Sequence, residues 1–142
     1  MGDDDSSVTT YRLTGTRDGR HRMRVDTGEE SFDVDRDLNP VQYLLGSLIG
    51  CLNFTATTVA REMDIEIEAM DATVEGDIDY ARYLGEETDT RAGLQAVRVT
   101  LTVDAAAGED ELAALLEAVE RRCPVSETIA SGTDLGVSVE AA

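Results

Sequence analysis

Residues 38–60 read LNPVQYLLGSLIGCLNFTATTVA and contain no charged side chain, although 30% of the chain is charged. Pro40 suits the first turn of a helix, because that position needs no backbone N–H. Side chains suited to one helical face then recur three and four positions apart. They are Val41, Leu44, Leu45, Leu48, Leu52, Thr55, Ala56 and Val59. Because the opposite face is also uncharged, the stretch predicts a central helix that is covered on every side and ends near residues 62–64.

Polar side chains argue against a membrane span in this stretch. They are Asn39, Gln42, Ser47, Asn53, Thr55, Thr57 and Thr58. No run of 18 apolar residues remains between them. The first seven residues, MGDDDSS, lack the cationic and apolar segments of a secretory signal. We therefore expect a soluble, cytoplasmic protein with an acidic disordered N-terminus at residues 1–7 and a single domain at residues 8–142.

The predicted helix is long for a chain of 142 residues. A helix of about 23 residues spans roughly 34 Å, which is about the diameter of a small domain. One domain of this size covers such an uncharged helix poorly. We therefore expect a homodimer in which two copies pack together.

The charge of the chain is strongly acidic. Thirty acidic and 12 basic residues give a formal net charge of −18, and all 12 basic residues are arginine. Nucleic-acid binding requires a cationic surface, so the composition excludes that class of partner. An acidic surface without lysine suits concentrated salt, where screening weakens self-repulsion, and it indicates a halophile's protein.

Hydrophobic periodicity predicts the remaining elements. Strands are expected at residues 8–16, 20–25, 31–34, 65–76, 97–103 and 137–140, and a second helix at residues 109–122. Asp-Gly and Asp-Thr-Gly sequences predict turns at residues 17–19 and 26–28. A polar connection at residues 77–93 contains Tyr80 and Tyr83. The order β-β-β-α-β-β-α-β predicts an α+β fold with an antiparallel sheet.

The two cysteines are the first candidates for chemistry, and the residues leave two interpretations open. Free cysteines are often inert and buried, and both Cys51 and Cys123 lie on apolar stripes. In a reducing cytosol a reactive thiol pair is the alternative to inert packing. Cys123 precedes Pro124 at a helix end, where we expect an accessible thiol beside Arg121 and Arg122. Cys51 lies mid-helix, so a lowered thiol pKa would need a cation from another element.

An arginine cluster could supply that cation. Arg12, Arg17, Arg20, Arg22 and Arg24 lie within 13 residues. For Arg20, Arg22 and Arg24 a solvated strand face is the better interpretation. Arg17 differs, because a side chain in a turn between strands can be aimed at a pocket.

The single histidine and the glycines indicate no further site. Alternation places His21 on the apolar face of its strand, so we interpret it as structural. The histidine, cysteines and carboxylates lack the spacing of a zinc site, and we expect neither metal nor cofactor. There is no glycine-rich phosphate loop and no Gly-x-Ser-x-Gly motif.

Three motifs together resemble the OsmC/Ohr family (osmotically inducible protein C and organic hydroperoxide resistance protein). They are Asn39-Pro40 before the helix into Cys51, Cys123-Pro124-Val125-Ser126 after the second helix, and Gly15-Thr16-Arg17-Asp18-Gly19-Arg20. The resemblance extends over about residues 8–140. It implies an intertwined α+β homodimer with two long central helices and active sites built from both subunits.

The resemblance also implies an activity, the thiol-dependent reduction of organic hydroperoxides. Cys51 would be the peroxidatic cysteine, Cys123 the resolving cysteine, and Arg17 the cation that holds the thiolate. A lipoyl-type or thioredoxin-type dithiol would then reduce the resulting disulfide.

This sequence departs from the family at one position. The family glutamate that pairs with the arginine follows Asn-Pro directly or one residue later, and here those positions are Val41 and Gln42. Glutamine can hydrogen-bond to arginine but does not neutralise it, so we expect modest turnover. Gln42, Tyr43 and Phe54 are expected to line the substrate pocket. The alternative is a non-enzymatic redox-sensing or small-ligand-binding protein that uses the same dimer-interface pocket.

The charge predicts that stability depends on salt. With a net charge of −18, self-repulsion at low ionic strength should destabilise the fold, and screening should restore stability. We expect the melting temperature to rise between about 0.1 M and about 2 M potassium chloride, as followed by circular dichroism. A flat or falling melting temperature would contradict the halophile interpretation.

Overall fold

The computed structural model describes residues 7–142, which form an α+β fold. These residues divide into two compact units, an N-terminal unit up to residue 43 and a C-terminal unit from residue 44. The expected disorder of residues 1–7 lies almost wholly outside the described residues, and the single domain from residue 8 stays a prediction.

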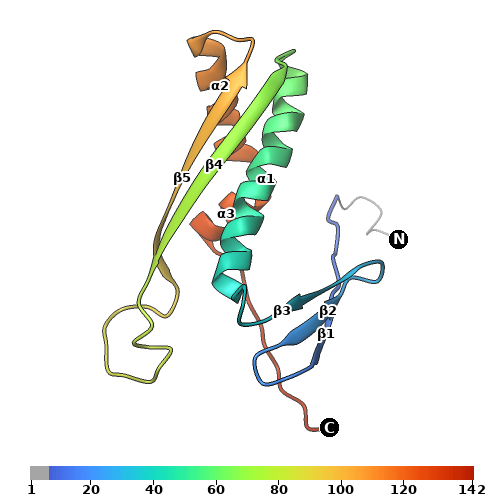
Figure 1. Ribbon diagram of the computed structural model, residues 1–142, viewed down its shortest axis with the longest axis vertical. Helices are drawn as coiled ribbons and strands as arrows, with labels where there is room; N and C mark the ends of the chain where they lie inside the picture. The colour runs from blue at the N-terminus through green and yellow to red at the C-terminus, as the bar shows by residue number, and fades with distance from the viewer. Residues whose placement is uncertain (1–6) are drawn as a thin grey trace. The chain divides into compact units, whose positions relative to one another are not determined.

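The N-terminal unit contains a three-stranded antiparallel sheet in the order β1-β2-β3 (Figure 1). The strands are β1 (Thr14–Arg17), β2 (Met23–Asp26) and β3 (Ser31–Val34). Both predicted turns are confirmed, and their glycines Gly19 and Gly28 have φ values of 128° and 101°, which favour glycine. The first strand begins at Thr14 rather than at residue 8, because its partner β2 ends opposite, at Asp26.

The β1–β2 turn is longer than predicted, and this changes the position of the histidine. The N–H of Asp18 donates to the carbonyl of Arg22 across the turn at 3.0 Å. Strand β2 therefore begins only at Met23. The prediction that His21 lies on an apolar strand face is wrong, because His21 is exposed in this turn.

The predicted long helix is confirmed as α1 (Pro40–Glu62). It begins at a reciprocal pair of hydrogen bonds. The Gln42 N–H donates to the Asn39 side chain and the Asn39 N–H donates to the Gln42 side chain, each at 3.0 Å. This is the capping-box arrangement, which satisfies two backbone donors that the helix cannot pair. The helix ends before Asp64, whose φ of 56° is left-handed.

One face of α1 is buried and the other is not. The buried residues are Leu48, Leu52, Ala56, Val59 and Ala60. Phe54 on the other face is 76% exposed, so a single chain does not cover the helix on every side as the sequence predicts. By length and mean hydropathy (1.4) alone α1 would suit a membrane span, and 33% of that window is buried inside the chain.

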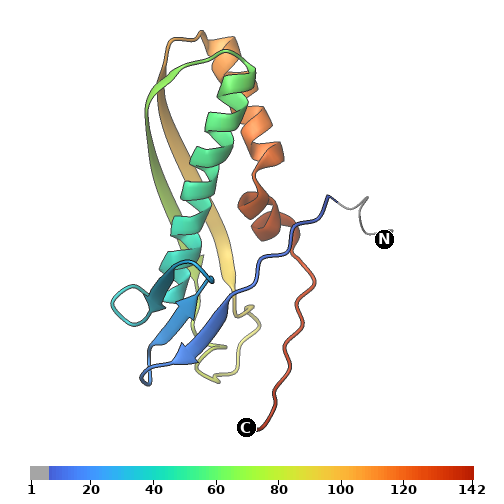
Figure 2. The ribbon, with the colours of Figure 1, turned by 90° about the vertical axis from the view of Figure 1, so that its right-hand side faces the viewer.

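The C-terminal unit is built on a long antiparallel hairpin of β4 (Ile67–Ile78) and β5 (Leu94–Ala105) (Figure 2). Alternate residues of both strands pack against α1 and α2 (Glu109–Arg122), and the outer face is polar. On that face the Arg98 guanidinium donates to both carboxylate oxygens of Asp77, at 2.8 and 2.9 Å. The buried core contains Leu48, Leu52, Ala56, Val59, Ala60, Ile65, Leu115, Val119 and Cys123.

The chain beyond α2 differs from the prediction in two ways. The structure contains a third helix, α3 (Pro124–Ser131), because Pro124 ends α2 and at the same time suits the first position of a new helix. The strand predicted at residues 137–140 is wrong for the described chain. Leu135, Val137 and Val139 alternate as in a strand, but no strand of the chain pairs with them.

Two neighbouring leucines on α2 test the packing of the core. Leu115 is 3% exposed and Leu116 is 46% exposed. Leu115→Ala should lower the free energy of unfolding by about 2–5 kcal/mol, because a buried leucine leaves a cavity. Leu116→Ala is the matched control and should cost clearly less in urea titrations. Equal losses would contradict the burial described here.

Candidate functional site

The C-terminal unit brings its two thiols together. Cys51 lies in the middle of α1 and is partly buried, and Cys123 lies at the junction of α2 and α3 and is 0% exposed. Both are free cysteines, Cys51 packs against the cluster that includes Cys123, and the Cys51 side chain interacts with the Cys123 thiol. The packing of α1 beside α2 therefore joins two residues that are distant in the sequence.

The surroundings of Cys123 favour its neutral form. Burial raises the pKa of the Cys123 thiol, and the neighbouring Cys51 side chain raises it further. The backbone N–H of Ser126 and the hydroxyl of Thr55 oppose this by favouring the thiolate. The net direction is upward, so the thiol is protonated at neutral pH.

The predicted accessibility of Cys123 is wrong. The sequence analysis placed this thiol at a helix end where it could be reached. In the structure α3 continues the chain directly after Cys123, and Val125 and Ile129 of α3 pack against the core. Helix α3 thus covers the Cys123 thiol.

The two arginines before Cys123 are engaged in ion pairs. Arg122 donates to both carboxylate oxygens of Glu62 at 2.7 and 2.9 Å, which ties the end of α2 to the end of α1. The Arg122 guanidinium lowers the pKa of Glu62. Arg121 lies 3.7 Å from the carboxylate of Glu117 on the same helix. Neither arginine is therefore free to hold a thiolate.

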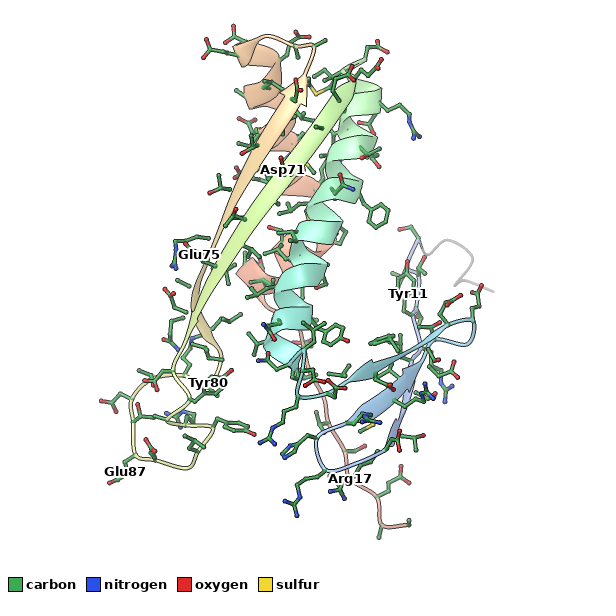
Figure 3. The ribbon with its side chains drawn as sticks, in the orientation of Figure 1. Tyr11, Arg17, Asp71, Glu75, Tyr80 and Glu87 are labelled. Carbon is green, nitrogen blue, oxygen red and sulfur yellow. The ribbon has the colours of Figure 1, made fainter. Side chains whose placement is uncertain are left out.

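Arg17 is the last residue of β1 and lies beside the β1–β2 turn, so the prediction that it lies in the turn is wrong (Figure 3). It is exposed, and no residue that the structure describes forms an ion pair with it. Its neighbours are different, because Arg22 pairs with Asp18 at 3.6 Å and Arg24 with Asp33 at 3.3 Å. Arg17 belongs to the N-terminal unit and the cysteines to the C-terminal unit, so its predicted role stays a prediction.

The three predicted pocket residues have varied surroundings. Gln42 takes part in the capping box of α1, and its side-chain oxygen accepts the N–H of Asn39. The Tyr43 hydroxyl donates to the Asp33 carbonyl at 2.7 Å, and its ring lies 6.1 Å from that of Phe32. Both contacts stabilise the junction between β3 and α1. Phe54 is exposed on the open face of α1.

A cavity of about 790 Å³ lies between β5 and the helices of the C-terminal unit. Its lining is largely apolar and includes Leu48, Leu52, Leu101, Leu115, Val119 and Ile129. Ser126 also lines it, whereas neither cysteine does. The sequence analysis missed this cavity, since none of its three pocket residues lines it. The strict alternation of β5 was the signal, because it directs a row of apolar side chains toward the helices.

Sequence reasoning also missed two polar groups at the thiol pair, Thr55 and the N–H of Ser126. Thr55 was counted only as part of the apolar face of the helix. The available signal was its spacing, because a residue four positions after Cys51 lies on the same side of a helix. Among residues 7–142 no cluster of histidine, cysteine and carboxylate side chains could hold a metal ion.

Comparison with known proteins identifies the fold. A family model described as OsmC-like protein matches residues 33–138. No curated protein sequence matches the chain. An OsmC-like protein from Mycoplasma pneumoniae has a similar structure, with a TM-score of 0.76, 21% identity and coverage of 93% of this chain and 96% of that one. The organic hydroperoxide resistance protein OhrB of Bacillus subtilis gives a TM-score of 0.57 and 23% identity, with 89% and 94% coverage.

A third solved structure is an organic hydroperoxide resistance protein from Elizabethkingia anophelis, with a TM-score of 0.62, 18% identity and coverage of 87% and 90%. At these identities the structural likeness establishes the fold, and the family model covers most of the chain. The α+β fold agrees with both comparisons. The chain belongs to the OsmC-like protein family.

Proposed function

We propose that this protein is a soluble, cytoplasmic thiol peroxidase that reduces organic hydroperoxides through Cys51 and Cys123. The observation that carries the proposal is the packing of one free cysteine, Cys51, against the buried core that contains the other, where the Cys51 side chain raises the pKa of the Cys123 thiol. Family membership and the similar organic hydroperoxide resistance proteins support a role in peroxide resistance.

The chemistry needs no metal or organic cofactor. The Cys51 thiolate attacks the terminal peroxide oxygen, the O–O bond breaks, and an alcohol leaves with one proton. Cys51 is then a sulfenic acid. The Cys123 sulfur attacks the Cys51 sulfur, and the sulfenic hydroxyl leaves as water with the proton of the second thiol. The peroxide has gained two electrons, and the protein holds one disulfide.

The two cysteines suit different steps. Cys51 is the less buried thiol, so peroxide would reach it first. Cys123 is fully buried and its pKa is raised, which protects it from direct oxidation until a sulfenic acid forms beside it. Arg17 would hold the Cys51 thiolate, since a guanidinium stays charged in any protein environment. In support, Arg17 has no acidic partner among the residues that the structure describes.

The apolar cavity supports an organic substrate over hydrogen peroxide. Its lining contains aliphatic side chains from both helices that precede or carry the cysteines, including Leu52, Ala56 and Val119, although neither cysteine lines it. Burial of a hydrocarbon group there would contribute about 25 cal/mol per Å² to binding, which hydrogen peroxide cannot gain. Gln42, Tyr43 and Phe54 are proposed as further substrate contacts. The amide nitrogen of Gln42 remains available, because only its oxygen takes part in the capping box.

A dithiol must reduce the Cys51–Cys123 disulfide to complete the cycle. We propose a lipoyl-type or thioredoxin-type donor, because either can exchange two thiols for one disulfide in two steps. The first thiol forms a mixed disulfide with one cysteine, and the second releases the reduced protein.

A second candidate function is a non-enzymatic redox sensor or small-ligand carrier. The size and apolar lining of the cavity favour it, because the same space would hold an apolar ligand without any reaction. The two positions where the family carries its glutamate are also occupied by neutral residues here, Val41 and Gln42, and this favours a non-enzymatic function.

Sulfenate trapping tests the proposed function. Reduced protein in high salt is mixed with tert-butyl hydroperoxide or hydrogen peroxide, and dimedone adducts are located by mass spectrometry. We expect faster thiol loss with the organic peroxide. Cys51→Ser should abolish the adduct, whereas Cys123→Ser should leave a trappable sulfenate on Cys51. Arg17→Ala should slow the first step without changing the fold, and Arg20→Ala is the matched control.

The outcomes separate the two candidates. An adduct on Cys123 in the Cys51→Ser protein would reverse the assigned roles. No adduct on either cysteine, with reversible binding of apolar ligands retained, would favour the non-enzymatic carrier.

We also propose that the protein acts as a homodimer. Large apolar side chains remain uncovered on α1 and on the C-terminal segment, where Leu135, Val137 and Val139 are 87%, 83% and 93% exposed. Monomers rarely expose apolar surface on this scale. The alternating spacing of the three residues suits a strand that pairs with a second copy.

Light scattering in molar salt should therefore give twice the chain mass of 15.3 kDa. Replacement of Leu135, Val137 and Val139 by serine should weaken the dimer, because that apolar row would no longer be buried. Replacement of Ser138 and Glu140 by alanine is the matched control on the alternate positions. A stable folded monomer of the unaltered chain would contradict the proposal.

A further inference from the structure

Thr55 is held over the thiol pair by its own helix. Its hydroxyl donates to the carbonyl of Cys51, one turn earlier, at 2.8 Å. The side chain is partly buried, and its hydroxyl lowers the pKa of the Cys123 thiol. One hydroxyl is therefore bonded to the backbone of the first cysteine and acts on the thiol of the second.

Two other threonines of α1 show that the backbone bond alone does not define this position. The hydroxyls of Thr57 and Thr58 donate to the carbonyls of Asn53 and Phe54 at 2.9 and 3.1 Å. Both are exposed, on the face of α1 away from the core. The three residues make the same local bond, and Thr55 is the one among them that faces a thiol.

The resolving step creates a demand for such a group. Cys123 reacts as a thiolate, which must be stabilised in a site with no exposure to solvent. The neighbouring cations Arg121 and Arg122 are bound to carboxylates. The remaining donors are the N–H of Ser126 and the hydroxyl of Thr55. Cys123 makes no side-chain capping hydrogen bond to α3, so the N–H of Ser126 is still available.

We infer that Thr55 is a positioning residue for the resolving step, and that its hydroxyl turns from the Cys51 carbonyl to the Cys123 sulfur as that thiol loses its proton. The inference rests on the proposed function. A hydroxyl has one hydrogen, so it donates to one of the two acceptors at a time. In the helix the Cys51 carbonyl also accepts the backbone N–H of Thr55. The carbonyl therefore stays hydrogen-bonded when the hydroxyl turns away.

The proton balance of this step is simple. The proton of Cys123 leaves with the hydroxyl of the Cys51 sulfenic acid as water, while the new S–S bond forms. Thr55 keeps its own hydrogen throughout. Its contribution is to stabilise the charge on the attacking sulfur and to direct that sulfur toward Cys51.

A single-turnover experiment measures this contribution. Reduced protein receives one equivalent of tert-butyl hydroperoxide, and the Cys51 sulfenate is trapped with dimedone at successive times. Thr55→Val should lengthen the sulfenate lifetime roughly tenfold, since hydrogen bonds to charged groups have effects of this size. Thr55→Ser should restore the unaltered lifetime. Thr58→Val is the matched control and should leave the lifetime unchanged.

A second measurement does not depend on peroxide chemistry. In a Cys51→Ser background, the ultraviolet absorbance of the Cys123 thiolate is followed against pH. Thr55→Val should move the midpoint to higher pH, because a donor that favours the thiolate is lost. Thr55→Ser and Thr58→Val should leave it in place. Circular dichroism verifies that each variant is folded.

The two measurements distinguish a failure of the proposed peroxidase function from a failure of the role inferred for Thr55. If the unaltered protein forms no sulfenate, the proposed function is wrong, and the midpoint still decides whether Thr55 acts on Cys123. If the sulfenate forms and its lifetime and the midpoint are the same in Thr55→Val, the role of Thr55 is wrong. Equal effects of Thr55→Val and Thr58→Val would also overturn it, because they would reflect the stability of the helix.

Discussion

The burial of one stripe of α1 against the β4–β5 hairpin and α2 is the constraint on which the C-terminal unit depends. Leu52, Ala56 and Val59 of α1 meet Leu115 and Val119 of α2 in a core with few other buried residues. The same contact brings the cysteines together. Cys51 lies beside the buried stripe of α1, and Cys123 comes directly after the buried stripe of α2. Folding and the candidate chemistry thus use one interface.

Local patterns predicted most of the elements. Pro40 fixed the start of α1 to the residue, and the alternation from Val97 to Val103 identified β5, because both signals act within a few residues of themselves. The strand at residues 137–140 failed for the opposite reason. Its alternation is real, but a strand exists only where a partner supplies hydrogen bonds, and the described chain supplies none. Alternation alone therefore does not produce a strand within one copy of the chain.

The candidate site shows where sequence reasoning ends. The motifs single out the two cysteines as candidates, but the burial of Cys123 could not be predicted from them. Cys123 ends one helix and begins the next, and the sequence analysis detected only the ending, because proline interrupts a helical pattern even when it starts a new helix. The cavity escaped prediction because it depends on the distance between β5 and the helices, which no single segment encodes.

The contact between the thiols has a consequence for chain entropy. A bond between Cys51 and Cys123 would close a loop of about 70 residues, and in the loop-entropy model such a cross-link restricts the unfolded chain by about 4 kcal/mol. The oxidised protein would then resist unfolding more than the reduced one. Oxidation would cross-link α1 to the junction of α2 and α3 and so make this part of the protein more rigid. Reduction of the disulfide by the dithiol would remove the cross-link and the added rigidity.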